Sequence, residues 1–85
     1  MPKSVFTEAY RALLDSLRSA RRSAGVSQPE LARRLGLPQQ FISRIELGVR
    51  RVDLVEYYAI MKALGVDPAE AILELLQKFP EKVEI

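Results

Sequence analysis

Four hydrogen-bonding side chains recur at helical spacing near the middle of the chain. Gln39 and Gln40 stand together, and Ser43 and Arg44 follow one turn later on the same side. An amide offers a donor beside an acceptor, and a guanidinium offers a planar fork of donors, so both suit paired hydrogen bonds to a flat partner. The segment therefore indicates recognition by hydrogen bonding, although an exposed helix start that is merely polar has the same composition.

Side chains on which most enzymes depend are missing from the chain. Its 85 residues include no Cys and no His, which excludes disulfides, thiolate nucleophiles, the common zinc sites and the usual general base. The carboxylates are scattered over expected helix starts and surfaces and form no recognisable pair. We expect no catalytic activity, no metal and no cofactor.

Basic charge is concentrated in the middle of the chain. Residues 17–51 hold eight Arg and two Glu, whereas residues 52–85 hold three Lys and seven acidic residues. Arg suits phosphates and guanine edges better than Lys does. Taken alone, the basic stretch fits a solvated, ion-paired surface equally well.

Length and composition predict one soluble domain over residues 1–85. A chain of 85 residues that is 48% apolar and 28% charged can bury one core but not two. No apolar run approaches the ~20 residues that span a bilayer, and no signal segment follows Met1. We expect a cytoplasmic protein without a membrane partner.

Start and stop signals divide the chain into five helical segments. Capping-box patterns at 27–30, 53–56 and 67–70 predict helix starts, because a Ser or Asp stands three residues before a Glu. Helix ends are expected at four glycines and one proline, namely Gly25, Gly36, Gly48, Gly65 and Pro80. No segment before Val83–Ile85 alternates with the period of a strand, so the fold class is all-α.

Apolar spacing predicts the buried face of each helix. The first stripe runs from Phe6 to Ala24, and the third helix turns Phe41, Ile42 and Ile45 inward. The expected apolar positions of the fourth helix include Val55, Tyr58, Ala59 and Leu64. Base stacking by Phe41, Tyr57 and Tyr58 is an alternative, but aromatic residues at helical spacing are more often core.

Residues 27–47 have the pattern of a helix-turn-helix: two short helices, a tight Gly-containing turn, and a polar outer face on the second. The stretch from Leu17 to Asp67 resembles the XRE or phage repressor/Cro family. The residues in that family's order and spacing are Arg21, Gly25-Val26-Ser27-Gln28, Glu30-Leu31-Ala32, Leu35-Gly36-Leu37, Gln39, Ile42-Ser43, Ile45-Glu46, Gly48 and Ala63-Leu64-Gly65-Val66. The resemblance implies a five-helix, lambda-repressor-like DNA-binding domain.

The resemblance also implies which side chains read base edges in the major groove. Gln39 and Gln40 would meet them first, joined by Ser43 and Arg44. Gln fits adenine and Arg fits guanine, and each good pair discriminates by roughly 1–3 kcal/mol. Pro38 replaces the family's common Ser or Thr cap, so the first turn of this helix is expected to be aimed differently.

Other residues would hold the DNA backbone or the scaffold. By the same resemblance, Gln28 touches the backbone and anchors the recognition helix, while Arg21 and Glu46 form a structural ion pair. Charge and the resemblance suggest phosphate contacts for Arg50 and Arg51. Two further pairs of residues carry expectations of their own. For Arg33 and Arg34, phosphate contact, solvation and ion pairing with Glu30 all remain open. Leu47 and Val49 stand where the family usually has polar or basic residues, so weaker contact with the DNA backbone is expected at these two positions.

Such proteins usually dimerise on half-sites about 34–36 Å apart, so a homodimer and an inverted-repeat operator in double-stranded DNA are expected. Residues 68–85 are the candidate dimerisation region, since apolar residues widen the stripe of the fifth helix, although core burial alone would also explain them. These are Leu73, Leu75, Leu76 and Phe79. The tail Val83–Ile85 would fit a strand pairing between subunits or a frayed terminus.

The sequence therefore predicts a sequence-specific, repressor-type transcriptional regulator. A controller protein of a restriction–modification system or an antitoxin would have the same features, and a separate regulatory protein is an expected partner. The alternative from another class is a protein-interaction module that keeps the fold.

Overall fold

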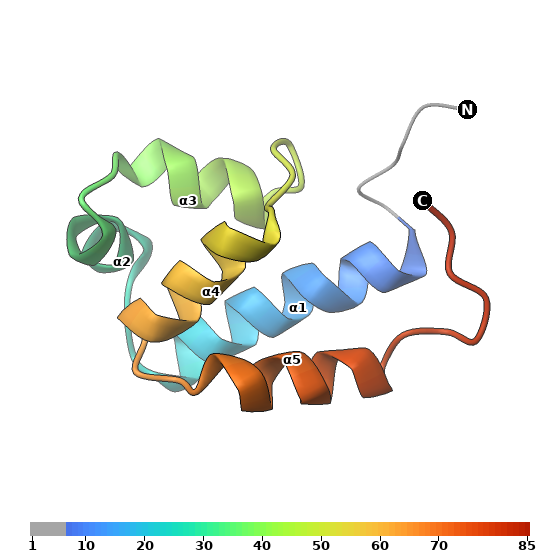
Figure 1. The fold of residues 1–85 in the computed structure, drawn as a ribbon. Coiled ribbons are helices and arrows are strands. Elements are labelled where there is room, and N and C mark those ends of the chain that lie inside the picture. Colours follow the sequence, from blue (N-terminus) through green and yellow to red (C-terminus); the bar gives the residue numbers. More distant parts are fainter. Residues whose placement is uncertain (1–6) are drawn as a thin grey trace.

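A computed structural model describes residues 7–85, which form five α-helices and no strand (Figure 1). The helices are α1 (Glu8–Ser23), α2 (Gln28–Leu35), α3 (Gln39–Glu46), α4 (Leu54–Ala63) and α5 (Pro68–Gln77). The predicted all-α fold class is confirmed, while Phe6 and the other residues before position 7 lie outside the described part. None of the described helices combines the length and apolar content that crossing a bilayer requires.

The predicted capping box of α4 is complete. The Asp53 carboxylate accepts a hydrogen bond of 2.7 Å from the Glu56 amide, and the Glu56 carboxylate accepts one of 2.9 Å from the Asp53 amide. Two amides that have no partner within the helix are thereby satisfied. This reciprocal pair fixes the point at which the chain enters α4.

At α2 and α5 the predicted boxes are only half formed. The Ser27 hydroxyl accepts from the Glu30 amide at 3.2 Å, but the Glu30 carboxylate binds two arginines of its own helix. Asp67 accepts from the amide of Ala69 rather than from that of Glu70. Each of these helices keeps its cap residue and loses the reciprocal bond.

The first four helices end in the same hydrogen-bonded turn. A glycine with φ between 70° and 79° follows each helix, and the next amide bonds to the carbonyl five residues earlier. The residue after the glycine is apolar in every case and commonly packs against the helix that it follows. Val26 is buried and Val66 half-buried, whereas Val49, after α3, is 63% exposed. The turn after α3 therefore leaves its apolar side chain exposed, whereas the turns after α1 and α4 cover theirs.

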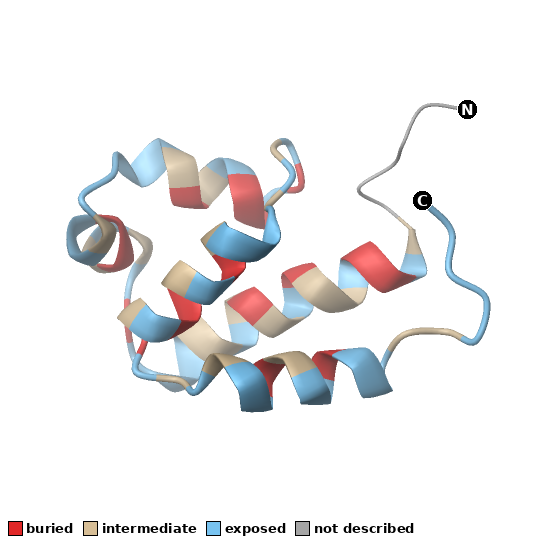
Figure 2. Ribbon diagram, in the orientation of Figure 1, coloured by how far each residue is buried: buried red, intermediate tan, exposed pale blue. Residues whose placement is uncertain are grey.

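The core collects the inner faces of all five helices (Figure 2). Burying side chains of this size contributes roughly 1.5–3 kcal/mol each. The least exposed large residues are Leu31, Ile42, Ile45, Tyr57 and Met61. Phe41 packs half-buried against this cluster, as predicted for core.

The predicted apolar face of α4 is right at Leu64, which is buried, and wrong at Val55 and Tyr58. Val55 is 77% exposed and Tyr58 is more than half exposed, while Tyr57, Ile60 and Met61 are buried. Helix α4 is apolar around most of its circumference, so its own period does not select a face, and packing on neighbouring helices does. Tyr57 is therefore core as expected and Tyr58 is not.

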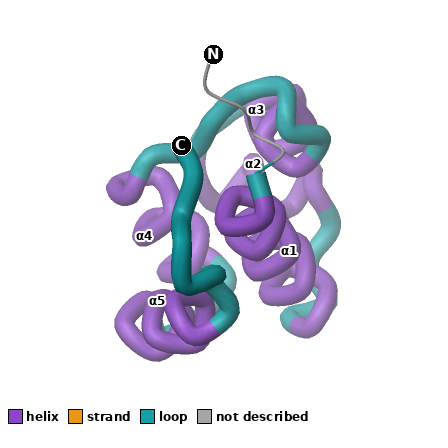
Figure 3. Tube along the Cα trace, turned by 90° about the vertical axis from the view of Figure 1, so that its right-hand side faces the viewer, coloured by secondary structure: helices purple, strands orange, loops and turns teal. Residues whose placement is uncertain are grey.

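Helices α3 and α5 lie on opposite sides of the bundle in both views (Figures 1 and 3). Helix α2 packs against α3 and α4, and α5 packs against α4 and α1. The outer surfaces of α3 and α5 can therefore meet different partners at once.

Candidate nucleic-acid interface

The outer face of α3 carries the hydrogen-bonding residues found in the sequence. Gln39, Gln40 and Arg44 are exposed, and Ser43 is partly exposed. Within residues 7–85, no hydrogen bond or ion pair engages the side chains of Gln39, Gln40 or Arg44. Their donors and acceptors are open to a partner.

Packing against α2 sets the orientation of this face. Ile42 and Ile45 point into the core beside Leu31 and Ala32 of α2. Pro38, the N-cap of α3, supplies no side-chain cap, as its residue type requires. Apolar packing and the helix-end contacts therefore hold α3 in place.

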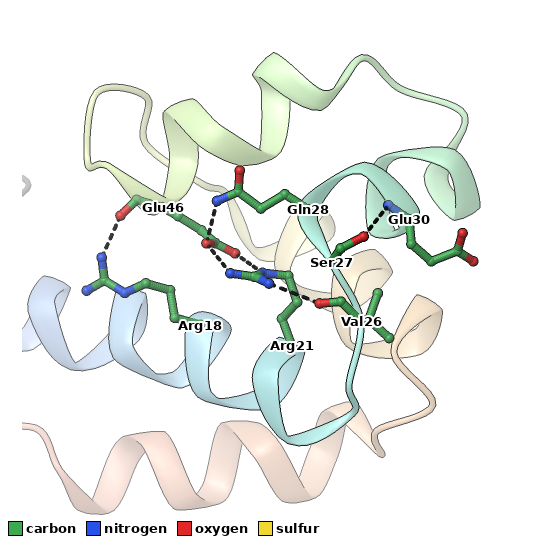
Figure 4. Close-up of polar contacts among 7 residues, drawn as sticks. All are labelled: Arg18, Arg21, Val26, Ser27, Gln28, Glu30 and Glu46. Carbon is green, nitrogen blue, oxygen red and sulfur yellow. Dashed lines mark hydrogen bonds and ion pairs between the residues drawn. The ribbon is translucent and has the colours of Figure 1, made fainter.

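A buried polar cluster centred on Glu46 joins the end of α3 to α1 and α2 (Figure 4). Arg21 donates from Nε and Nη2 to the two carboxylate oxygens of Glu46 at 2.7 and 2.9 Å, and Gln28 donates to Oε1 at 2.9 Å. Arg21 also donates to the carbonyl of Val26 at 2.9 Å, while Arg18 donates to the Glu46 carbonyl at 2.7 Å. The expected ion pair is present, and Gln28 anchors α3 through the same carboxylate.

The cluster keeps Glu46 ionised despite burial. Burial opposes the charge, but hydrogen bonds from Arg21 and Gln28 and the charges of Arg21 and Arg18 outweigh it, so the pKa of Glu46 lies below its ordinary value. The Glu46 hydrogen bond raises the pKa of Arg21. The two side chains are only 12% and 7% exposed, so water screens the pair weakly.

Arg33 and Arg34 share one carboxylate on α2. They approach Oε2 of Glu30 at 2.6 and 3.0 Å, and their hydrogen bonds lower the pKa of Glu30 to about 2. Arg34 also donates to the carbonyl of Ala63 at 2.9 Å. Of the three alternatives, ion pairing is therefore present, and both guanidinium groups stay exposed.

Arg50 is braced within the loop between α3 and α4. Its two terminal nitrogens donate to Glu56 at 3.0 and 2.7 Å, and its guanidinium carbon lies 4.5 Å from the centre of the Phe41 ring. The hydrogen bond from Arg50 holds the pKa of Glu56 below its usual range. The capping carboxylate of α4 thus also fixes the loop.

Arg51 lies over a second ring. Its guanidinium carbon is 4.4 Å from the centre of the Tyr10 ring, and the Tyr10 hydroxyl accepts a hydrogen bond of 2.8 Å from the Val52 amide. A residue at the start of α1 therefore holds the loop that follows α3.

The predicted dimerisation residues divide between surface and core. Leu73 and Leu76 are more than half exposed, and Phe79 is half-buried. Leu75 is 5% exposed and packs in the core, so its assignment to an outer surface was wrong: it lies on the side of α5 that faces the bundle. The tail Val83–Ile85 is exposed and forms no strand.

Exposed apolar residues on α4 were missed in the sequence. Leu54, Val55 and Tyr58 are all more than half exposed. Leu54 lines a groove together with Leu76 of α5 and Phe79, which follows that helix. The feature of the sequence that could have indicated them is that α4 lacks a clearly polar side. A fully buried helix and a helix with a second binding face both have this pattern, so it does not distinguish them.

The chain is similar to several known proteins. A helix-turn-helix family model matches residues 17–70. An XRE-family like protein from Pseudomonas syringae pv. tomato str. DC3000 is 43% identical, with a TM-score of 0.80 over 85% of this chain and 88% of that one. The clp gene regulator ClgR from C. glutamicum is 30% identical, with a TM-score of 0.67 over 79% and 86%. An uncharacterized HTH-type transcriptional regulator, y4dJ, of Sinorhizobium fredii (strain NBRC 101917 / NGR234) is 36% identical over 52 residues, which are 61% of this chain and 68% of that protein.

Fold and site together define a helix-turn-helix domain. The chain belongs to the XRE type of the helix-turn-helix family, a class of DNA-binding transcriptional regulators and not of enzymes.

Replacing Glu46 with Gln should lower the free energy of unfolding by about 3–5 kcal/mol at neutral pH, because it leaves Arg21 buried without its counter-ion. Since the folded pKa of Glu46 lies below its ordinary 4.5, its ionised form stabilises the fold above that value. This contribution is lost as the pH falls through the folded pKa. Urea unfolding at neutral pH and at about pH 3 measures both effects.

Glu74→Gln is the matched control, since it neutralises an exposed carboxylate on α5. It should change stability by less than about 0.5 kcal/mol. The difference in the free energy of unfolding between wild type and Glu46→Gln should be smaller at about pH 3 than at neutral pH. A Glu46→Gln variant as stable as wild type at neutral pH would show that the pair does not hold α3.

Proposed function

We propose that the chain is a sequence-specific, repressor-type regulator of double-stranded DNA that acts as a homodimer and places α3 in the major groove. The observation that carries this proposal is the outer face of α3. Gln39, Gln40 and Arg44 are exposed and unengaged within the described residues, while Glu46 fixes the same helix from its inner side. Preorganised donors on a rigid helix suit base readout.

The side chains of α3 match particular base edges. Gln39 and Gln40 occupy the first turn, the part of a recognition helix that reaches the bases, and each fits adenine N6 and N7. Arg44 fits guanine O6 and N7, and the Ser43 hydroxyl accepts or donates. Each good bidentate pair contributes roughly 1–3 kcal/mol of discrimination.

Residues around α3 supply the backbone contacts in this proposal. They flank the readout face, and all but one of them are arginines: Gln28, Arg33, Arg34, Arg50 and Arg51. Arg33 is strongly exposed, with 73% of its side chain accessible. A guanidinium already held by a carboxylate or a ring loses less side-chain entropy when a phosphate arrives.

The proposed dimer surface is the outer side of α5. Leu73 and Leu76 supply exposed apolar area, and Leu54 of α4 extends it across the groove that Phe79 helps to line. Because α3 lies on the opposite side of the bundle from α5, a partner seated there leaves the readout face uncovered (Figures 1 and 3). Two-fold symmetry then calls for an inverted repeat.

Selection of bound duplexes from a random library, at a stated near-physiological salt concentration, tests the function directly. We expect enrichment of an inverted repeat with half-site centres about 10 base pairs apart. Binding without an enriched motif would contradict sequence-specific regulation. It would instead favour a protein-interaction module on the same fold.

Substitution of two arginines should separate base readout from backbone contact. Arg44→Ala should relax the preference at particular base pairs, whereas Arg51→Ala should weaken binding to all sequences and reduce the salt slope by about one unit. Competition binding against single-base operator variants at several salt concentrations measures both. Uniform weakening by both variants, each folded by circular dichroism, would contradict the assignment of Arg44.

Introducing charge on α5 tests the dimer surface. Leu73→Glu and Leu76→Glu should give monomers in sedimentation velocity, because a carboxylate would be buried without a partner in the interface. Both positions are exposed, so the fold should persist. Val49→Glu is the control, since Val49 is exposed in the turn after α3, on the opposite side of the bundle from α5. Dimers that survive both Leu substitutions place the interface elsewhere.

A further inference from the structure

Leu47 continues the readout face of α3. It is 68% exposed and follows the last residue of the helix, with helical dihedral angles of φ −80° and ψ −8°. It therefore keeps the helical phase, four residues after Ser43 and three after Arg44. Seven residues separate it from Gln40, which is two turns. An exposed leucine thus stands among side chains that donate and accept hydrogen bonds.

The position of Leu47 is fixed by the turn that ends α3. Its own amide donates to the Ser43 carbonyl at 2.9 Å, and the Gly48 amide donates to the Ile45 carbonyl at 3.0 Å. The amides of Val49 and Arg50 both donate to the Arg44 carbonyl, at 2.9 and 3.1 Å. Buried Ile45 and Glu46 immediately precede it and hold this end of the helix on the core.

Among residues 7–85, few exposed apolar side chains lie on the same side of the bundle as Leu47. The other strongly exposed apolar residues on helices lie on α4 and α5, and α5 is on the opposite side of the molecule (Figure 1). Within the described part of the chain, the exposed apolar residue at this end of α3 is Val49. The residues that correspond to Val49 in the turns after α1 and α4 are Val26, which is buried, and Val66, which is half-buried. A partner surface that accepts Leu47 must offer an apolar group beside hydrogen-bonding groups.

In the major groove, the apolar group at a base edge is the C5 methyl of thymine. We propose that Leu47 is a specificity-determining residue that packs on a thymine methyl next to the base pair that Arg44 reads. This inference rests on the proposed function and deepens it. It adds an apolar contact to a face otherwise made of hydrogen-bonding side chains.

The test uses the operator obtained by selection, with each thymine replaced in turn by deoxyuridine, which pairs alike and lacks the methyl group. For the wild-type protein, replacing the thymine at one position of each half-site should weaken binding about fourfold per half-site. This is the loss expected when one apolar carbon is removed from a contact. Leu47→Ala should bind the thymine and deoxyuridine operators equally. Leu47→Met, which keeps an apolar side chain, should retain the preference for thymine.

The outcomes separate this inference from the proposed function. A selected operator that contains no responsive thymine, or a deoxyuridine effect equal in wild type and Leu47→Ala, overturns the role of Leu47 and leaves the regulator intact. A selection without any motif overturns the proposed function and this inference with it. Circular dichroism checks that both variants fold, which their exposed position favours.

Discussion

The Arg21–Glu46 ion pair is the contact on which the placement of α3 depends. Helix α3 has eight residues and no side-chain cap, so it depends on tertiary contacts both for its stability and for its orientation. Its final carboxylate is bound by α1 through Arg21 and by α2 through Gln28. A buried pair of this kind is weak evidence for net stability, but removal of one partner leaves an uncompensated charge. Its structural consequence is geometric, since two helices converge on the last turn of the third.

The loop after α3 is fixed by a second set of contacts, in which two residues each make two contacts. Glu56 both caps α4 and binds Arg50, and Tyr10 supports Arg51 while its hydroxyl holds the Val52 amide. Cations resting on ring faces keep part of their donor edge toward water. The basic side chains beside α3 are therefore ordered before any polyanion arrives.

Helix number and helix limits could be predicted because glycine, proline and capping residues act locally. The four positive-φ glycines end the first four helices where the pattern placed them. The exposed face of α4 could not be predicted, because Val55 and Tyr58 are as apolar as the buried Tyr57 and Met61. The choice that Glu30 makes was also beyond local patterns, because the capping box and ion pairing with Arg33 and Arg34 both fit its position. In the structure its carboxylate binds the two arginines and not the Ser27 amide. Leu75 shows the same limit, since an apolar stripe does not reveal how wide the core contact is.

The separation between the inner and outer sides of α3 has an evolutionary consequence. Ile42, Ile45 and Glu46 hold the helix from inside, whereas the side chains of Gln39, Gln40 and Arg44 bond to nothing else within residues 7–85. Substitutions at the outer positions can accumulate with little effect on folding. If these residues read bases as proposed, copies of the gene can diverge in the DNA sequences that they bind while they keep one scaffold. Whether two such copies bind the same operators would then depend on the few residues on the outer face of α3.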